Sequence, residues 1–524
     1  MTYSAAIVGL LAVPVTIRAI LTADGKSRRT WVGSLHIADP HPEACCVARR
    51  LAAVLDGFGP NHPCRCRGRV TVQIEPQTAY KCMADMGLAI LLEVVDAATD
   101  RGLKPPTDVC WLGGVGLDES IQPVSGLLTL AGAWPDKGLV VPTGNEREAS
   151  LLSRRCLLAE NIGQVAAYIL RGVELKSPKP VCTEGQVTSP CAVDMADIRG
   201  SGRAKRAAEI AAAGGLGLLL SSAPGTGKTM LGQAFAGILP PMTDQERFEV
   251  TQMQESAGLL SAGQMASHRP FRLVHHSVSM QALVGGGSGG RITPGEVSLA
   301  HRGVLFLDEA PEFTKNALDA LRQPCEAGVV HISRVGVQAT LPASFALLAA
   351  ANPCRCGYAG TYRCSRCNSW SAHQICTCGA VAQPRCTCAA NEARRYQARL
   401  SGPLLDRVDM RVRMLPLSVI DRQSTTPESS AVVQQRVVQA RERMASRLKP
   451  LGVRTNGTIP PGKAMRACDW TAEGLRAYER VLETEPMSNR RADRLIRVAQ
   501  TIADLEGRAI SEENVAEATN LVIG

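Results

Sequence analysis

The chain has 524 residues, of which 45% are hydrophobic and 20% are charged, and its formal net charge is +10. This length provides for about two to four domains. No apolar run approaches the roughly 20 residues that a membrane-spanning helix needs, so we expect no membrane partner. The apolar start Ala5–Ala12 has no basic residue before it and is soon followed by Pro14. These features disfavour a signal peptide and predict a cytoplasmic protein.

Residues 1–178 alternate short apolar runs with amphipathic stretches, a pattern that predicts an α/β or α+β domain. Residues 179–192 fall in a segment rich in Pro, Ser and Thr, which predicts a linker. We expect strands at Ala6–Leu11, Val15–Leu21, Val70–Ile74, Val109–Leu112 and Gly138–Val141, and helices at Met83–Ala98, Gly126–Ala133 and Val165–Arg171.

A phosphate-binding loop is predicted at Ser221–Thr229, which has the sequence SSAPGTGKT. The apolar run Leu216–Leu220 before it predicts a buried strand, and Met230–Ala236 after it predicts a helix. Strand, glycine-bearing loop and helix are the context that such a loop requires. Gly225 and Gly227 allow the backbone to curl, so that successive N–H groups point at phosphate oxygens.

Two side chains in this loop carry the expected chemistry. Lys228 would place its charge on the β- and γ-phosphates of ATP, and the Thr229 hydroxyl would bind Mg²⁺. Ser222 replaces the first glycine of the usual motif, which leaves a glycine turn without a ligand as the alternative. A helix predicted at Asp194–Gly214 leads into the loop's strand. We expect the nucleotide contacts to come from Ser222, Ala223, Pro224, Gly225, Thr226, Gly227, Lys228, Thr229 and Met230.

Polar residues follow two later apolar strands. The strand Val304–Leu307 ends at Asp308 and Glu309, where Asp308 would hold Mg²⁺ through water and Glu309 would polarise the attacking water. The strand Phe345–Ala350 is followed by Asn352, which would help to position that water. The alternative for Asp308 and Glu309 is a solvated acidic turn, and the alternative for Asn352 is an ordinary Asn-Pro turn.

Two insertions lie between these strands. Leu283–Gly295 is rich in glycine and predicts a loop, and Val329–Leu341 alternates like a hairpin, with Arg334 near its turn. Both insertions are compatible with elements that grip DNA and with plain surface loops. The sequence leaves the two interpretations open.

Eight of the 19 cysteines fall in a short insertion at residues 354–388. Pairs of thiols joined by short loops favour tetrahedral zinc, and eight thiols could fill two Cys₄ sites. An iron–sulfur role stays open, although the C-x-C pairs differ from the usual cluster runs. A further site at Cys45, Cys46, Cys64 and Cys66 is a second open possibility. The expected zinc ligands are Cys354, Cys356, Cys364, Cys367, Cys376, Cys378, Cys386 and Cys388.

The C-terminal part predicts four helices, at Ser429–Leu448, Thr471–Leu482, Asn489–Leu505 and Glu512–Val522. Apolar residues recur at helical spacing in the third of them, which predicts a packed face. These residues are Leu495, Val498, Ala499 and Ile502.

Several strings of the sequence resemble the magnesium-chelatase-type AAA+ ATPases, and within them the YifB/ComM branch. The resemblance is strong over residues 193–524 and moderate over Leu112–Gly172, whereas residues 22–80 match poorly. Val274 and Ala310 depart from the family pattern at positions outside the chemistry. The strings that carry the resemblance are Ile198–Thr229, Arg269–Ser277, Pro294–Phe313, Leu321–Gly328 and Ser401–Asp409.

The resemblance implies an AAA+ core at residues 193–420 and a C-terminal helical lid at 428–524. It also implies a Lon-protease-like domain of the ribosomal S5 domain 2 type at 1–178. Lon proteolysis needs a serine activated by a lysine, and none stands near Lys81–Asp85, so we expect no peptidase. Family roles carried over by position make Asn352 the sensor 1 residue, Arg407 the arginine finger offered to a neighbouring subunit, and Arg490 the sensor 2 arginine of the lid.

The resemblance implies an ATP-dependent motor that acts on DNA. We therefore expect a hexameric homo-oligomer that migrates DNA branches in recombination and natural transformation, with ATP and Mg²⁺ as cofactors. One alternative is a magnesium-chelatase motor subunit, which the cysteine insertion and the Lon-like region disfavour. The other is a nucleotide-gated scaffold without motor activity.

Overall fold

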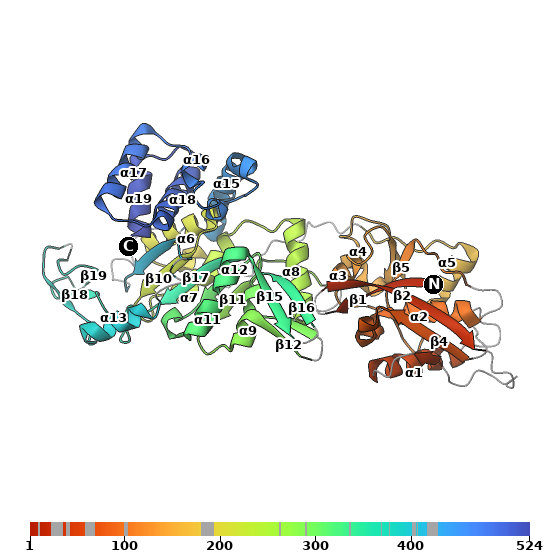
Figure 1. The fold of residues 1–524 in the computed structure, drawn as a ribbon. Helices are drawn as coiled ribbons and strands as arrows, with labels where there is room; N and C mark the ends of the chain where they lie inside the picture. The colour runs from red at the N-terminus through yellow and green to blue at the C-terminus, as the bar shows by residue number, and fades with distance from the viewer. Residues whose placement is uncertain are drawn as a thin grey trace.

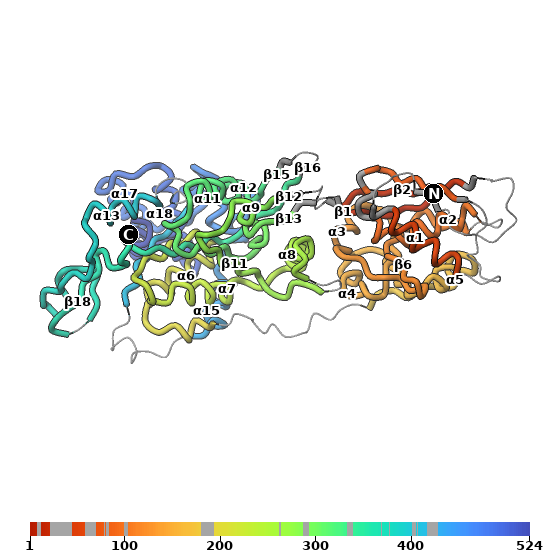
Figure 2. The backbone as a smooth tube through the Cα atoms, turned by 90° about the horizontal axis from the view of Figure 1, so that it is seen from below, coloured from red at the N-terminus to blue at the C-terminus, as the bar shows by residue number. Residues whose placement is uncertain are grey.

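The computed structural model describes most of the chain and divides into an N-terminal α/β region, a central α/β region and C-terminal helices (Figure 1). The described residues are 1–8, 11–22, 35–37, 42–57, 69–98, 103–179, 193–260, 264–288, 291–334, 337–367, 369–376, 378–400, 405, 407–416 and 428–523. Figure 2 shows the N-terminal region at one end of the molecule, next to helix α8 (Asp244–Ser256) of the central region.

The N-terminal region is built on a seven-stranded mixed sheet with the order β3-β4-β2-β1-β5-β8-β9. The pairs β1–β2 and β2–β4 are antiparallel, and the other pairs of the sheet are parallel. This arrangement confirms a mixed α/β architecture. Its elements are β1 Thr2–Val8, β2 Leu11–Thr22, β3 Leu35–Ile37, α1 Pro42–Gly57, β4 Arg69–Glu75, η1 Gln77–Met86, α2 Gly87–Ala98, β5 Val109–Trp111, β6 Gly114–Val115, β7 Ile121–Gln122, α3 Leu127–Ala131, β8 Gly138–Pro142, α4 Glu146–Ala149, β9 Cys156–Ala159 and α5 Ile162–Arg171.

The central region contains a five-stranded parallel sheet with the order β11-β14-β17-β10-β21. The strands are β10 Leu218–Ser222, β11 Phe271–Val274, β14 Val304–Leu307, β17 Ala346–Ala351 and β21 Met410–Met414. Strand β17 therefore lies between β10 and β14. Because parallel strands end at the same edge, the residues that follow these three strands meet there.

Side chains alternate between the two faces of this sheet. Leu218 and Leu220 point into one buried cluster and Leu219 into the other, as the two-residue period of a strand requires. Helices α6 (Gly202–Gly214) and α7 (Lys228–Ile238) cover the first face. The second cluster also includes residues of α9 Met280–Val284, α10 Glu296–Leu299, α11 Lys315–Ala320 and the hairpin β15 Val329–Arg334 and β16 Val337–Pro342, and α12 Arg322–Ala327 follows α11.

The C-terminal helices share the first of these clusters. Helix α15 packs on α6, α7 and α18, and the predicted apolar residues Leu495, Val498, Ala499 and Ile502 are all buried. The C-terminal bundle and the sheet thus have one continuous core. Its helices are α15 Ser430–Leu448, α16 Ala464–Ala467, α17 Ala472–Thr484, α18 Asn489–Glu506 and α19 Glu512–Val522.

Two local predictions were wrong. The helix predicted over Asp194–Gly214 begins only at Gly202, because Gly200 and Ser201 have φ values of 63° and 55°, and Met195–Asp197 forms a short 3₁₀ turn instead. The loop predicted at Leu283–Gly295 contains a hairpin of β12 (Gly285–Ser288) and β13 (Arg291–Pro294). Strand β12 was not predicted because three of its four residues are glycines, which have low strand propensity. It is held by backbone pairing with β13.

One further prediction is confirmed, and other elements were not predicted. The hairpin predicted around Arg334 is confirmed as β15 and β16, with Arg334 paired to Val337 at its end. Several elements were not predicted, among them helices α1 and α8 and strands β3, β9, β11 and β21. Within the part of the chain that the structure describes, no helix combines the length and the apolar character needed to cross a bilayer.

Candidate functional site

The predicted phosphate-binding loop connects β10 to α7. Gly225 and Gly227 have φ values of 73° and 89°, in the left-handed region that favours glycine. A Cβ added to either would meet no atom within 4 Å. The backbone conformation, and not lack of space, is therefore what requires glycine here. Gly227 is also the N-cap of α7, so the loop's N–H groups and the positive end of the helix face the same place.

Ser222, which replaces the usual first glycine, is built into the loop. Its Oγ lies 2.5 Å from Thr226 Oγ1 and accepts a hydrogen bond of 2.9 Å from Lys228 Nζ. Thr226 Oγ1 in turn donates to the carbonyl of Ala223 at 3.1 Å. The serine thus joins both arms of the loop and keeps its curled form.

Lys228 lies among oxygen acceptors from two strands. Its Nζ donates to Ser222 O at 3.1 Å and to Asn352 Oδ1 at 2.9 Å. Burial lowers the pKa of Lys228, while the charges of Asp308 and Glu309 act in the opposite direction. Asn352 reaches the lysine because β17 ends beside β10, so the structure brings these two predicted residues together.

Thr229 and Asp308 are also brought together. The Thr229 hydroxyl donates to Asp308 Oδ2 over 3.4 Å, and the Glu309 N–H donates to Asp308 Oδ1 over 3.0 Å. A hydroxyl and a carboxylate side by side are the hard oxygen ligands that Mg²⁺ prefers. The donor set therefore fits the metal that the sequence predicts at this position.

Glu309 has an unusual backbone and two histidine neighbours. Its φ is 51°, which is strained for a residue other than glycine. Its Oε2 lies 3.2 Å from His276 Nδ1 and 3.8 Å from His275 Nε2, and its side chain is 43% exposed. The histidines were not among the predicted site residues. Their position directly after β11, which pairs with β14, was the signal that could have found them.

Arg407 lies in a different group of charges. It forms an ion pair with Glu326 of α12. Burial lowers its pKa, Cys325 acts in the opposite direction, and the nearby cations Arg490, Arg322 and Arg494 lower it further. The structure thus places the two predicted arginines, Arg407 and Arg490, near each other. It does not place either among the groups that perturb the pKa of Lys228 in the same chain.

The backbone of Arg407 is tied to the start of β10. Asp409 Oδ2 accepts a hydrogen bond of 2.8 Å from the Gly217 N–H, and the Gly217 carbonyl accepts bonds from the N–H groups of Asp409 and Met410. A Cβ at Gly217 would lie 3.3 Å from Val408 Cα, so these segments pass very close to each other. Strand β10 therefore fixes Arg407 at one end and the phosphate-binding loop at the other.

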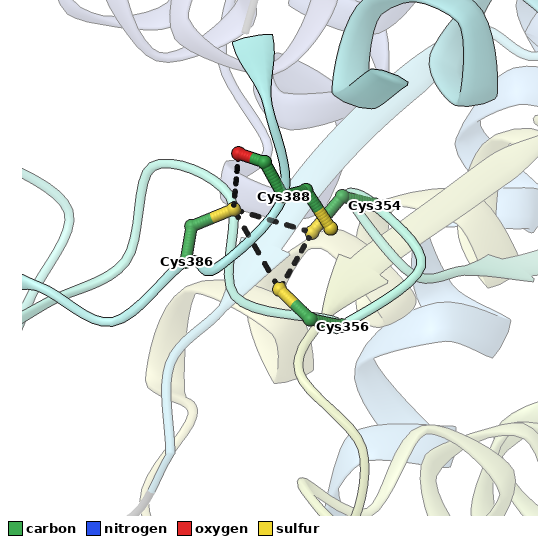
Figure 3. A group of neighbouring side chains, drawn as sticks. All are labelled: Cys354, Cys356, Cys386 and Cys388. Atoms are coloured by element: carbon green, nitrogen blue, oxygen red, sulfur yellow. Dashed lines mark hydrogen bonds between the residues drawn. The ribbon is translucent and has the colours of Figure 1, made fainter.

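The eight predicted cysteine ligands form two separate groups. The inner cysteine site consists of Cys354, Cys356, Cys386 and Cys388 (Figure 3), and the outer cysteine site of Cys364, Cys367, Cys376 and Cys378. The sequence did not show which four cysteines belong to each site. Strands β18 Tyr362–Cys364, β19 Trp370–Ser371 and β20 Ala382–Pro384 form a small sheet around the outer site, and α13 Ala390–Ala398 follows the inner one.

The sulfur positions suit a tetrahedral metal. Sγ atoms of the inner site lie 3.2, 3.7 and 3.6 Å apart, and those of the outer site 3.5 and 3.4 Å apart. Four sulfurs bound to zinc at about 2.3 Å would be about 3.8 Å apart.

The possible additional cysteine site is not supported where it can be examined. Cys64 and Cys66 lie outside the described residues. Cys45 and Cys46 are exposed, and among the described residues neither belongs to a group of three or more metal-ligand side chains.

A parallel sheet with this strand order and a glycine-bearing loop before α7 defines a P-loop protein of the AAA+ type. Residues 194–373 and 365–421 match the family model described as magnesium chelatase, subunit ChlI, and residues 427–521 match magnesium chelatase, subunit ChlI C-terminal. The chain belongs to the magnesium chelatase ChlI family, whose members are AAA+ ATPases.

Relatives extend this similarity to almost the whole chain. An uncharacterized protein of Mycobacterium tuberculosis is 37% identical over 467 residues, which is 88% of this chain and 86% of the relative. The uncharacterized protein YifB of Escherichia coli is 32% identical over 525 residues, with 99% and 96% covered. The competence protein ComM of Haemophilus influenzae is 33% identical over 529 residues, with 98% and 96% covered. The predicted relationship to YifB and ComM is confirmed.

Proposed function

We propose that this chain is an ATPase whose catalytic site is completed by a second copy of the chain. The observation that carries this proposal is the separation of two sets of residues. Lys228, Thr229 and Asp308 converge at the phosphate-binding loop. Arg407 lies beside Gly217 at the opposite end of β10 and pairs with Glu326, and Arg490 lies near it. Arginines of this kind stabilise charge on a transferring phosphoryl group. A neighbouring subunit would bring them to the site.

Each residue then has a task. Lys228 exchanges its contacts with Ser222 and Asn352 for phosphate oxygens, and loses little by doing so because both present acceptors are uncharged. Thr229 and Asp308 would hold Mg²⁺, which would supply positive charge against the phosphates. Glu309, once it leaves His276, orients the attacking water, and Asn352 fixes the geometry beside it. Arg407 and Arg490 of the neighbour complete the enclosure, and a hexameric ring is the assembly we expect.

We propose DNA as the substrate of the motor. The chain has a formal net charge of +10, and Arg334 occupies the end of the hairpin β15–β16, the element that we expect to bind a phosphate backbone. The relative of Haemophilus influenzae is named a competence protein. A ring of this kind would act in the cytoplasm as a branch-migration helicase in recombination and natural transformation.

The same proposal assigns the remaining parts. Both cysteine sites bind zinc, residues 1–178 form a Lon-protease-like domain without proteolytic activity, residues 193–420 form the AAA+ core, and residues 428–524 form its lid. A second candidate is a magnesium-chelatase motor subunit. It is favoured by a match to the magnesium-chelatase 67 kDa subunit of Chlorobaculum parvum, which covers 26% of this chain at 28% identity.

The deciding experiment measures ATP hydrolysis with and without forked or four-way DNA, for the wild type and Glu309→Gln. We expect DNA to raise turnover, and the variant to bind ATP without hydrolysing it. Equal turnover with and without DNA contradicts a DNA motor. Metal insertion into a porphyrin with a partner protein, and no effect of DNA, would favour the chelatase subunit.

A further inference from the structure

The two cysteine sites have similar ligands but different surroundings. Cys364 and Cys376 of the outer site pack in a small cluster with Ala382, next to the short strands of the insertion. The inner site begins two residues after Asn352 and lies against the nucleotide site. Figure 3 shows its four side chains converging from two separate segments of the chain.

The first turn of the inner site touches the phosphate-binding loop. The Gly357 N–H donates to the Cys354 carbonyl over 3.0 Å, which closes the turn. Gly357 has a φ of 84°, and a Cβ at this position would overlap Cδ of Pro224. Nothing larger than glycine fits between the cysteine turn and the loop, so movement of one is transmitted to the other.

The same turn is held from its other side by Arg413 of β21. Arg413 Nη2 donates to Ala359 O at 2.6 Å and to Thr361 Oγ1 at 2.9 Å. In the sheet, Arg413 is the direct partner of Ser221, the residue of β10 that precedes Ser222. The turn is therefore enclosed between two neighbouring strands and the loop that one of them carries.

The two halves of the inner site also join distant parts of the chain. Cys354 and Cys356 follow Asn352, whose Oδ1 accepts a hydrogen bond from Lys228. Cys386 and Cys388 lead into α13, whose Gln397 donates to the Pro353 carbonyl over 3.0 Å. A metal that binds all four thiols closes this long loop and fixes the residues after β17.

From these contacts we infer that zinc in the inner cysteine site positions the phosphate-binding loop and Asn352 for nucleotide binding, and that zinc in the outer site does not. The inference rests on the proposed nucleotide site and adds a metal requirement to it. The inner site acts through Gly357 on Pro224 and through Cys354 on Asn352. It touches no phosphate, so it is a positioning element and not part of the chemistry.

The test compares two double variants. The inner variant combines Cys356→Ser with Cys386→Ser, and the outer variant combines Cys367→Ser with Cys378→Ser. We expect the wild type to hold about two zinc ions, measured by plasma mass spectrometry, and each double variant to lose one. The inner variant should bind N-methylanthraniloyl-ATP at least about 10-fold more weakly, and hydrogen exchange of residues 221–229 should accelerate. The outer variant should match the wild type in both measurements.

A second pair of variants keeps all eight thiols. Gly357→Ala should retain both zinc ions yet weaken nucleotide binding, because its Cβ displaces Pro224. Gly379→Ala is the matched control, since Gly379 of the outer site has a similar φ of 79° and an added Cβ would meet nothing within 4 Å. The two glycine variants test the inference even if the cysteine variants fail to fold.

The outcomes separate this inference from the proposed function. Unchanged exchange at residues 221–229 after loss of the inner zinc overturns the inference, as does an equal effect of the two double variants. If Lys228→Ala binds the nucleotide analogue as tightly as the wild type, the proposed nucleotide site fails. The exchange measurement still decides the inference in that case, because it needs no nucleotide.

Discussion

His276 Nδ1 lies 3.2 Å from Glu309 Oε2, so the carboxylate proposed to orient water is held by an imidazole at the end of the adjacent strand. The second histidine of the pair, His275, is fixed by a contact of 3.1 Å between its Nδ1 and Ser277 Oγ. This arrangement draws Glu309 toward β11. Release of Glu309 from His276 is then a step that a substrate or a neighbouring subunit can control.

Replacement of His276 by alanine should therefore raise ATP hydrolysis in the absence of DNA. The contact joins two partly exposed side chains and lacks hydrogen-bond geometry, so it contributes at most about 1 kcal/mol. We therefore expect basal turnover to rise a few-fold and stimulation by DNA to shrink. Steady-state hydrolysis with and without DNA measures both. Ser277→Ala, which removes only the contact to His275, should have a smaller effect. Lower basal turnover in His276→Ala would mean that the histidine assists the reaction.

Replacement of Lys228 by alanine should abolish most nucleotide binding. The loop keeps its hydrogen bond between Ser222 and Thr226, but it loses the charged donor to the phosphates. Loss of a charged hydrogen bond predicts an affinity about 10- to 100-fold lower. Titration with a fluorescent ATP analogue measures it. Lys315→Ala, on the exposed start of α11, is the control and should bind normally.

Local sequence predicted the parts of the site that depend on a single strand and its following residues. The loop Ser221–Thr229, the pair Asp308 and Glu309, and Asn352 each follow an apolar run whose length and flanking residues define a buried strand. Their convergence also follows from the shared edge of a parallel sheet. The phosphate-binding region could therefore be located without coordinates.

Contacts between distant segments could not be read in this way. No sequence pattern states that Cys354 joins Cys386 and not Cys364, because this depends on how the insertion folds back. The contact of His276 with Glu309 was missed because strand β11, which precedes the histidines and pairs with β14, was not predicted. Helix α1 was missed although its helical pattern is present: Val47, Leu51, Val54 and Leu55 recur at helical spacing and are buried. The role of Ser222 could not be predicted, because its hydroxyl contacts Thr226 only after the loop has adopted its curled conformation.

Replacement of Arg407 by alanine should leave nucleotide binding intact and reduce hydrolysis by about 10³-fold or more, as expected for an arginine that stabilises transferring phosphate. Arg480→Ala is the control, because Arg480 is an exposed cation of α17 whose side chain is 62% accessible. Single-turnover hydrolysis separates binding from chemistry.

Mixing tests whether Arg407 acts on a neighbour. Inactive Arg407→Ala chains retain Lys228, and inactive Lys228→Ala chains retain Arg407, so a mixed ring contains some complete sites. We expect hydrolysis to reappear when the two variants are combined and to follow their ratio. Failure of the mixture to regain activity, although both variants assemble, would contradict a site shared between subunits.

The contact between the N-terminal and central regions should depend on pH through Glu255 of α8. Burial, together with the charge of Glu148 of α4, raises the pKa of Glu255 to about 8 from its ordinary value of 4.5. Glu255 therefore keeps its proton in the folded chain where an unfolded chain would lose it. Between pH 4.5 and 8 the unfolded state binds fewer protons, so stability falls as pH rises through this window.

Glu255→Gln keeps the uncharged shape of the protonated side chain and removes its titration. The variant should unfold at a higher temperature than the wild type at pH 8, and the difference should shrink toward pH 4.5. It should vanish about one pH unit lower, where the Glu255 carboxyl is neutral in both the folded and the unfolded state. Glu473→Gln, whose side chain is 64% exposed on α17, is the control and should show no such pH-dependent difference. Calorimetric scans across this pH range provide the measurement. A constant difference between wild type and Glu255→Gln at every pH would mean that Glu255 does not titrate across the contact with Glu148.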